Sequence, residues 1–574
     1  MRLTRIELKK FRSIEKCIIY PRDVWCLVGE NNSGKSAILR ALNSFFNLDV
    51  EREAFLEGSH QYTKASWPQV WLDFSEVPTD SKLSPYSTEG KCKVRFRFKP
   101  QSESFTYEVD CKGWEETDFN IPCEINKSIN YVFISPVRGP KQLQWDEETL
   151  LRSAVEAYLN HYTSSRDNAT PKFIEAAKFL ENNALSSIAN DLASLYDLRH
   201  DFDFKIRYQP DIKYSDFLNK INFFVRDKGV SVDLADCGTG IQSMVIIALH
   251  RYIASLNDRR IIIGLEEPES NLHPQSQREL VSSLTGADGV GESSQVIMTT
   301  HSPVLIDELD HDQVVLVRKV SDDSRGFKSL VSQLDNNFWD KTGLDEVKYY
   351  KFHKYQNSEF FFSRGIILVE GKSDEGVLRI LMERENIDLE SNGVSVMSLE
   401  GVENIRYPYY LLKKLGIPCF YILDKDYFFP YKNGSKKKSR DAHGFPQYKF
   451  SYKEDCLIEE IVPLGDDRNK LLDFFESNHT KALDILEEYN VVCMRRNLEA
   501  DIFVSHEARK IFANVVNGLE EVPSKHDLLV DKSQQIKTPH YIEATVDRLP
   551  NKNLPHSLSR IKSCITKFID VINN

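Results

Sequence analysis

Alternation of apolar and polar positions dominates the first 110 residues. It is found in residues 2–8, 16–20, 69–74, 92–98 and 105–109. A period of two places the apolar side chains on one face of a strand. These segments therefore predict an antiparallel sheet with one buried face.

Continuous apolar runs form a second pattern. Residues 24–28 (Val-Trp-Cys-Leu-Val) precede a Gly-rich loop, and residues 35–46 then place Ala, Ile, Leu and Phe at helical spacing. This order predicts a buried strand, a loop and an amphipathic helix. Further runs at 261–265, 366–369 and 419–423 predict buried strands of α/β domains.

Helical periodicity replaces these patterns between residues 147 and 200, for instance at Phe173, Ala176 and Ala177. The long separation between the Gly-rich loop and the acidic strand end at Glu266 implies an insertion. We expect four parts: residues 1–146 and 231–345 as two halves of a nucleotide-binding head, 147–230 as a helical insertion or dimerisation arm, and 346–574 as a second α/β domain.

The Gly-rich loop has the spacing Gly-x-x-x-x-Gly-Lys-Ser. Its candidate nucleotide-binding residues are Gly29, Asn31, Asn32, Ser33, Gly34, Lys35 and Ser36. Such a loop surrounds phosphates with backbone N–H groups at a helix N-terminus. Lys35 is expected to reach the terminal phosphates of ATP, and the Ser36 hydroxyl to coordinate Mg²⁺.

Two later segments complete the expected nucleotide site. Glu266 and Glu267 end the apolar strand at 261–265, and we expect Glu266 to hold Mg²⁺ and Glu267 to polarise the attacking water. His301 follows another apolar run and is expected to reach the γ-phosphate. Upstream, a helix begins within Cys237–Ser243 and offers a second anion-binding N-terminus; its candidate residues are Gly238, Gly240, Gln242 and Ser243.

Four carboxylates follow the two downstream apolar runs: Glu370, Asp374, Asp424 and Asp426. The carboxyl ends of adjacent parallel strands meet at one edge of a sheet, so we expect these side chains to converge. Hard oxygen ligands suit Mg²⁺ or Mn²⁺. Two such ions could activate water and stabilise the leaving oxygen of a phosphodiester.

Local geometry favours the same convergence. Ser373 is a plausible N-cap, which places Asp374 in the first turn of a helix. Asp424 and Asp426 are two residues apart and point the same way if the strand continues through them. Together with the nucleotide site, these acids predict a nucleotide-gated enzyme that acts on nucleic acid.

Composition narrows the protein class. The 574 residues imply two to four domains, and 28% charged and 41% apolar residues are ordinary for a globular protein. Ten cysteines without a Cys-x-x-Cys pair argue against a zinc ribbon or disulfide framework and fit the cytoplasm. No secretory signal or membrane-spanning run is evident. The net charge of −12 argues against a protein that coats DNA.

The nucleotide-site residues resemble the ABC-type ATPase heads, in the branch that includes SMC-like proteins. The resemblance implies that Gly238–Ser243 completes the ATP site of a second subunit, and hence a homodimer or higher homo-oligomer. This chain has Glu266 where Asp is commoner, and it lacks a Leu-Ser-Gly-Gly signature.

The downstream acids resemble the TOPRIM domain of topoisomerases, primases and certain nucleases. An ABC-type head followed by TOPRIM resembles the OLD (overcoming lysogenization defect) family of ATP-dependent nucleases. The resemblance implies metal-ligand roles for the four carboxylates and for Glu459, and contact of Lys525 with the scissile phosphate; a surface lysine is the alternative. It also implies prokaryotic defence against phage, with a second protein or a nucleic-acid sensor as a possible partner.

The expected fold class is therefore α/β: an ABC-type ATPase head with an antiparallel β subdomain and an inserted helical arm, followed by a TOPRIM-like parallel α/β domain. The leading function is an ATP-binding, metal-dependent DNA endonuclease or nickase. A nucleotide-switched DNA clamp or scaffold with a degenerate TOPRIM site is the alternative, favoured by Leu457 in place of an acid. A topoisomerase ranks last, because no breakage domain is evident.

Overall fold

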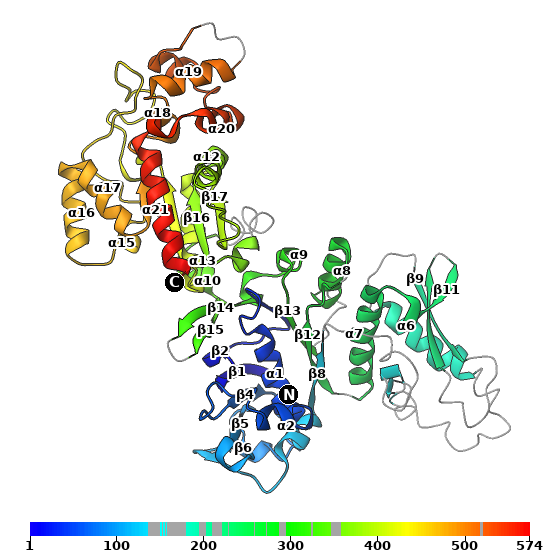
Figure 1. Ribbon diagram of the computed structural model, residues 1–574. Helices are drawn as coiled ribbons and strands as arrows, with labels where there is room; N and C mark the ends of the chain where they lie inside the picture. The colour runs from blue at the N-terminus through cyan, green and yellow to red at the C-terminus, as the bar shows by residue number, and fades with distance from the viewer. Residues whose placement is uncertain are drawn as a thin grey trace, which may run out of the picture. The chain divides into compact units, whose positions relative to one another are not determined.

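The computed structural model forms two compact units, Met1–Asn336 and Asn337–Asn574, each described here by itself (Figure 1). It describes residues 1–135, 150–151, 153–154, 157, 179–194, 202–208, 221–227, 229–257, 259–270, 272–285, 294–322, 325–345, 358–516 and 521–573. The boundary between the units falls before the expected junction at residue 345. Much of the expected arm at 147–230 lies outside the described residues.

An antiparallel sheet begins the N-terminal unit. Its strand order is β2-β1-β4-β5-β6-β7. The strands are β1 (Arg2–Phe11), β2 (Ile14–Ile19), β4 (Gln69–Ser75), β5 (Cys92–Lys99), β6 (Ser104–Asp110) and β7 (Trp114–Glu115). Along β4 and β5 the buried and half-buried positions alternate, as the sequence predicts.

A mixed sheet carries the nucleotide-binding elements, in the order β15-β14-β3-β13-β12-β8. Its strands are β3 (Val24–Val28), β8 (Ile129–Ile134), β12 (Arg260–Glu266), β13 (Ser294–Thr299), β14 (Val314–Asp322) and β15 (Gly326–Gln333). All neighbours pair in parallel except β14 and β15. The ends of β3, β12 and β13 therefore lie at one edge. Helix α1 (Lys35–Phe46) shares a core with both sheets.

The described part of the insertion is not wholly helical. A π-helical segment (Leu180–Leu185) and α6 (Ser186–Ser194) are accompanied by an antiparallel sheet. Its order is β11-β10-β9, with β9 (Phe202–Tyr208), β10 (Ile221–Asp227) and β11 (Val230–Asp233). Phe204 on β9 and Phe223 on β10 are both buried, and their ring centroids lie 5.9 Å apart. The expectation of a helical arm is corrected here, because a period-two pattern favours strands over helix.

The remaining described helices of the N-terminal unit are α2 (Leu48–Leu56), α3 (Ile121–Asn126), α7 (Thr239–Leu256), α8 (Pro274–Thr285) and α9 (Pro303–Asp307). Among the described helices of the whole chain, none has the length and apolar character of a membrane span.

The C-terminal unit is built on a four-stranded sheet in the order β17-β16-β18-β19. Its strands are β16 (Gly365–Val369), β17 (Val394–Ser398), β18 (Cys419–Leu423) and β19 (Val491–Cys493), and every pair is parallel. This is the predicted parallel α/β domain, and the carboxyl ends of β16 and β18 lie side by side.

Helices make up most of the rest of this unit, some packed against the sheet and others lying beyond them (Figure 1). They are α10 (Phe338–Thr342), α12 (Lys372–Glu383), α13 (Arg406–Leu415), α14 (Lys425–Phe428), α15 (Ile458–Ile461), α16 (Asp466–Ser477), α17 (His479–Glu488), α18 (Leu498–Ile502), α19 (His506–Val515), α20 (Pro539–Arg548) and α21 (His556–Asn573). Residues of α12, α20 and α21 share one core with β16 and β18. The fold class is thus the one predicted, with the sheet added in the insertion.

Candidate nucleotide and metal sites

The Gly-rich loop joins the end of β3 to α1. Gly29 has φ 142° and Gly34 has φ 108°, which L side chains rarely adopt. A Cβ on Gly29 would lie 2.0 Å from the carbonyl oxygen of Val317, and one on Gly34 would lie 2.3 Å from the hydroxyl of Ser329. Both glycines are therefore required by the path of the loop.

Lys35 is 6% exposed, and its ammonium turns back onto the loop. Its Nζ donates hydrogen bonds of 2.9 Å to the carbonyl oxygens of Gly29 and Glu30. Burial lowers the pKa of Lys35 to about 8, while the nearby carboxylates of Glu267 and Glu269 partly oppose that shift. The loop thus holds a desolvated cation in the position expected for binding phosphates.

Ser36 and Glu266 meet across the sheet edge. The Ser36 hydroxyl donates to the Glu266 carboxylate, which joins the first turn of α1 to the end of β12. Two oxygens suited to Mg²⁺ are therefore adjacent. Glu267 follows with a positive φ of 45°, and its backbone N–H donates to the Thr299 carbonyl at 3.1 Å. The expected water-polarising residue is thus fixed by β13.

His301 follows β13 at the same edge. Its backbone N–H donates to Oε1 of Glu269 at 2.7 Å. Burial, followed by the charge of Lys35, lowers the pKa of His301, and burial raises the pKa of Glu269. Glu269 was not assigned a role from the sequence, although it belongs to the same acidic segment. It positions the backbone that carries His301.

The helix expected to act on a second subunit is α7. Gly238 is its N-cap and Gly240 lies in its first turn. Gln242 is 3% exposed, and its Nε2 donates to the carbonyl oxygens of Leu234 and Cys237 at 3.1 and 3.0 Å. These contacts hold the preceding turn against the helix. The side chain of Ser243 lies outside what the structure describes.

Three of the predicted metal ligands converge in the C-terminal unit. Glu370, Asp424 and Asp426 each place a carboxylate oxygen within 4.8 Å of the other two. The backbone N–H of Asp424 donates to Oε1 of Glu370 at 2.8 Å, and the Tyr431 hydroxyl donates to Oδ2 of Asp426 at 2.6 Å. Hard oxygen ligands in this arrangement suit Mg²⁺ or Mn²⁺.

Burial and the charges of neighbouring carboxylates act strongly on Glu370 and Asp424. Burial raises the pKa of Glu370 to about 8, with the charges of Asp426 and Asp374 as further causes. The pKa of Asp424 is raised well above its ordinary value by burial and then by Glu370. Clustered carboxylates behave in this way when no cation balances them. The donor set therefore fits divalent ions.

Asp374 lies beside this group rather than in it. Its Oδ2 accepts from the backbone N–H of Gly371 at 3.1 Å, and burial raises its pKa to about 7, followed by the charge of Glu499. Gly371 is the N-cap of α12, so the expectation of Ser373 as the cap is wrong. Ser373 already lies inside the helix, because the carboxylate of Asp374 accepts the backbone N–H of Gly371 and so caps the helix there.

Glu499 is an acid that the sequence did not single out. It follows β19, the strand beside β18, and its charge raises the pKa of Asp374 and Asp424. Its spacing from Asp424 has no sequence signature, because seventy-odd residues of helix and loop intervene. Only the pairing of β18 with β19 brings it to this edge.

Glu459 is not brought into the carboxylate group. It is exposed in the short helix α15, and the described cluster of ligand atoms contains only Glu370, Asp424 and Asp426. The expectation for Glu459 is corrected, because neighbouring Cys456, Leu457 and Ile458 are the buried residues of this segment. Their burial turns the next side chain outward.

Contrary to what the sequence suggested, Asp424 and Asp426 do not lie on a continued strand. β18 ends at Leu423, and Asp424 is the N-cap of α14. The two acids therefore do not alternate along a strand. They converge because the chain turns into a helix between them, and Leu498 N–H donates to Oδ1 of Asp424 at 3.2 Å.

Lys525 lies near the C-terminal end of the chain. Its Nζ is 5.6 Å from the ring centroid of Phe445, which also carries the guanidinium of Arg496 at 4.3 Å. The carbonyl of Arg496 accepts from the backbone N–H of Lys425, the residue between Asp424 and Asp426. Lys525 is thus linked to the carboxylate region only indirectly, through Phe445, Arg496 and the backbone of Lys425.

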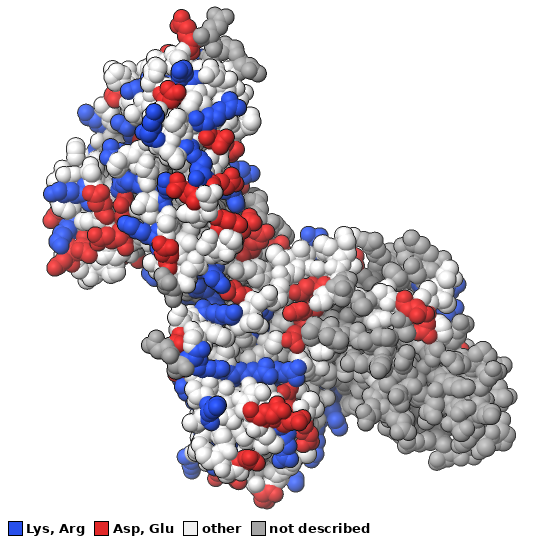
Figure 2. Space-filling model, viewed as in Figure 1, with Lys and Arg blue, Asp and Glu red and all other residues white. Residues whose placement is uncertain are grey.

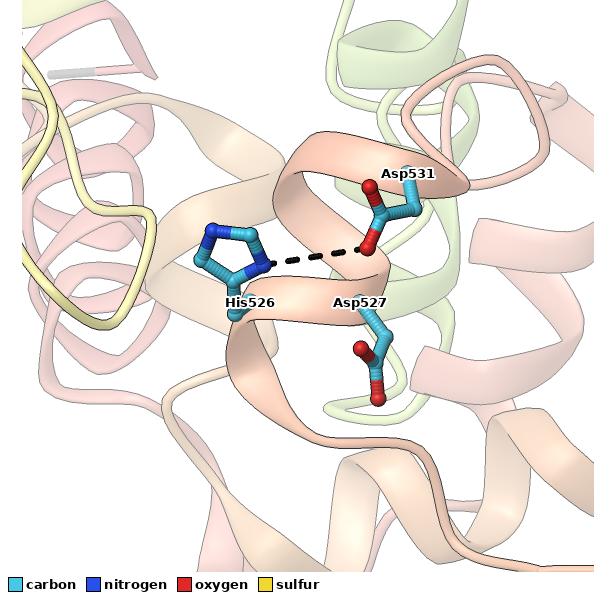
Figure 3. A group of neighbouring side chains, drawn as sticks. All are labelled: His526, Asp527 and Asp531. Carbon is cyan, nitrogen blue, oxygen red and sulfur yellow. Dashed lines mark ion pairs between the residues drawn. The ribbon is translucent and has the colours of Figure 1, made fainter.

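A second acidic group follows Lys525 (Figure 3). His526 Nδ1 lies 3.7 Å from Oδ2 of Asp531, and His526, Asp527 and Asp531 each place one ligand atom within 4.8 Å of the other two. The carboxylate of Asp527 accepts from the backbone N–H of Ser524 at 3.1 Å, and the Ser524 hydroxyl accepts from the Asp527 N–H. This reciprocal capping stabilises the turn that carries Lys525.

Family models match both units. The AAA ATPase domain matches residues 1–128 and 91–306, more than half of the chain, and the TOPRIM domain of overcoming lysogenization defect-like proteins matches residues 361–426. The second match includes Glu370, Asp374, Asp424 and Asp426.

Curated relatives cover most of the chain. The OLD nuclease of Thermus scotoductus is 24% identical over 74% of this chain and 82% of its own length. The Old nuclease of Escherichia phage P2 is 22% identical over 74% and 78%, and the endonuclease GajA of Bacillus cereus strain VD045 is 22% identical over 74% and 75%.

Among solved structures, an SMC head bound to the C-terminal winged-helix domain of ScpA is 13% identical, covers 58% of this chain and 98% of its own, and has a TM-score of 0.42. By the two domain matches and the curated relatives, the chain belongs to the overcoming lysogenization defect (OLD) family of ATP-dependent nucleases, and it joins an ATPase domain to an OLD-like TOPRIM domain.

Proposed function

We propose that this protein is a divalent-metal-dependent DNA endonuclease or nickase whose ATPase head controls cutting. The supporting observation is the convergence of Glu370, Asp424 and Asp426 within 4.8 Å at the end of two paired strands. A single buried acid has structural uses, but a group in which burial and neighbouring carboxylates raise the pKa of Glu370 and Asp424 destabilises a fold unless a cation compensates.

In this proposal Glu370, Asp424 and Asp426 hold Mg²⁺ or Mn²⁺, and Asp374 supplies further negative charge for a second ion. Bound ions would activate water and stabilise the leaving oxygen of the phosphodiester. Tyr431 holds Asp426 in place through its hydroxyl. Lys525, which has no direct contact with the carboxylates among the contacts described above, would contact the scissile phosphate.

In the head, Lys35 and the loop N–H groups would bind the ATP phosphates, and Ser36 with Glu266 would hold Mg²⁺. Glu267 would orient the attacking water and His301 would contact the γ-phosphate. Residues Gly238, Gly240, Gln242 and Ser243 would complete the site of a second subunit in a homodimer. The buried contacts of Gln242 favour a role in shaping that helix end.

Plasmid cutting tests the nuclease proposal. Supercoiled plasmid with Mg²⁺ or Mn²⁺ should be converted to open-circle or linear DNA by the wild type, and Asp424→Asn should reduce the rate by at least about 100-fold. Asp466→Asn, at the exposed start of α16, makes the same chemical change away from the cluster and should cut normally. Equal cutting by wild type and Asp424→Asn would refute the proposal.

The second candidate is a nucleotide-switched DNA clamp with a degenerate TOPRIM site, and Leu457 together with the exposed Glu459 favours it. A clamp would bind DNA in response to ATP without cutting it under any metal condition. We further propose that the enzyme acts in the cytoplasm in defence against phage. Phage plating on cells expressing wild type or Asp424→Asn tests that role, and equal plating would refute it.

A further inference from the structure

A basic pocket lies beside the carboxylate group in the C-terminal unit. Its cavity measures about 760 Å³. Six cations line it: Lys425, Lys432, Lys449, Arg495, Arg496 and Arg560. No Asp or Glu is among its lining residues, although the chain as a whole carries a net charge of −12.

Most of this positive charge is uncompensated. Arg496 pairs with Asp501 at 3.4 Å, and Arg560 pairs with Asp484 and Glu487. The other four cations form no ion pair with any residue that the structure describes. Figure 2 shows Lys and Arg interspersed with Asp and Glu on the face of this unit that it presents, so unpaired cations in one cavity stand apart from the general surface.

Aromatic rings form one wall of the pocket. Phe450 is 60% exposed and its ring lies 4.4 Å from that of His479, which in turn lies 4.0 Å from the buried ring of Phe429. Burial lowers the pKa of His479 to about 4, so this group of tilted rings is neutral near pH 7. The exposed ring of Phe450 offers a flat face to a nucleic-acid base.

Residues that line the pocket connect it to the carboxylate group. Tyr448 lines it and stacks on Tyr431 at 5.3 Å, and Tyr431 donates its hydroxyl to Asp426. Lys425 lines it as well and lies in the sequence between Asp424 and Asp426. Two stacked rings, Tyr448 and Tyr431, therefore separate a phosphate chain in the pocket from the proposed metal ligand Asp426.

We propose that this pocket binds a single-stranded segment of nucleic acid next to the cutting site, with phosphates on Lys432, Lys449 and Arg495 and an unpaired base on Phe450. The inference rests on the proposed nuclease function. The cavity volume is that of pockets for small ligands, roughly 300–1,000 Å³, so it admits nucleotides of one strand but not a duplex. Stacking on Phe450 likewise requires a base that is not paired.

Binding without cutting tests the proposal. Fluorescence anisotropy in EDTA would follow a labelled oligothymidine of about 12 nucleotides over a series of salt concentrations. The double variant Lys432→Ala/Lys449→Ala should bind more weakly, and the slope of log K against log salt should fall by about 1.4, since each contact to a single strand contributes about 0.7.

Phe450→Ala separates stacking from charge. It should lose about 5- to 150-fold in affinity while the salt slope stays that of the wild type. Because Lys432, Lys449 and Phe450 are exposed, these changes should leave the melting temperature unchanged. Lys470→Ala/Lys567→Ala removes the same charge at two exposed lysines outside the pocket and should retain the wild-type slope.

The inference would be overturned by wild-type binding of the pocket variants, by an equal loss in the lysine control, or by competition from thymidine monophosphate as effective as that from the oligonucleotide. The last would identify a small-ligand site. Duplex bound with the same affinity and the same response to both variants would also contradict a single-strand pocket. The plasmid-cutting comparison of wild type with Asp424→Asn tests the nuclease proposal by itself. Failure of that proposal would therefore be recognised independently of these binding results.

Discussion

Replacing Glu370 by Gln should stabilise the metal-free protein. Burial and neighbouring carboxylates raise the pKa of Glu370 from 4.5 to about 8. Between these values the folded protein binds more protons than the unfolded chain, so stability falls as pH rises through this window. At about pH 7.5 the raised pKa of Glu370 lowers the free energy of unfolding by about 4 kcal/mol, from roughly three pH units at 1.36 kcal/mol each.

Glutamine is neutral and keeps an oxygen that can accept the backbone N–H of Asp424. Glu370→Gln should therefore recover most of that cost. For a unit of this size, about 2–4 °C per kcal/mol predicts a rise in melting temperature of roughly 8–16 °C. At about pH 5 the cost is below about 1 kcal/mol, and the gain should nearly disappear.

Differential scanning calorimetry in EDTA at both pH values measures this effect. Adding Mn²⁺ should raise the melting temperature of the wild type and leave Glu370→Gln almost unchanged, because the ion stabilises only a protein that binds it. Glu383→Gln makes the same change at an exposed position of α12 and should stay within about 0.5 kcal/mol of the wild type. A lower melting temperature for Glu370→Gln at about pH 7.5, or an equal gain at both pH values, would refute the reasoning.

Three further predictions concern the head. Because burial holds the pKa of Lys35 at about 8, ATP affinity should fall by up to about 10-fold per pH unit above that value; flat affinity to about pH 10, measured with a fluorescent ATP analogue, would contradict it. Glu267→Gln should bind ATP but hydrolyse it about 100-fold or more slowly, as a phosphate-release assay would show, and unchanged turnover would remove its assigned role. Gly29→Ala should abolish ATP binding and destabilise the head by about 2–5 kcal/mol, because of backbone strain and the clash with Val317. Gly90 also has a positive φ but has open space around it, so Gly90→Ala should lower the free energy of unfolding by about 1 kcal/mol and bind ATP normally. Normal ATP binding by Gly29→Ala would show that the clash does not matter.

The loop and the strand ends were predictable because their chemistry is local. Gly29, Gly34 and Lys35 are separated by a few residues, so their spacing alone determines a phosphate-binding turn. Glu370 and Asp424 each follow a continuous apolar run, and parallel strands bring such positions to one edge. The sequence contains both pieces of information directly.

Other features depend on long-range packing. Glu499 reaches the same edge only because β19 pairs with β18, and the sequence between them does not specify that pairing. The direction of Glu459 follows from the burial of its neighbours in a four-residue helix. Strands β9 and β10 were missed because their alternating segments are short and follow the helical periodicity of residues 147–200, which was extended over the whole insertion.

The hydrogen bonds of Lys35 have a consequence for how the head releases its ligand. With its ammonium already held by two loop carbonyls, and the Ser36 hydroxyl already held by Glu266, an arriving triphosphate exchanges existing bonds for new ones. The net gain on loading is then smaller than the number of contacts implies. Once the spent nucleotide leaves, the same hydrogen bonds of Lys35 and Ser36 can form again, which favours repeated rounds of nucleotide binding and release.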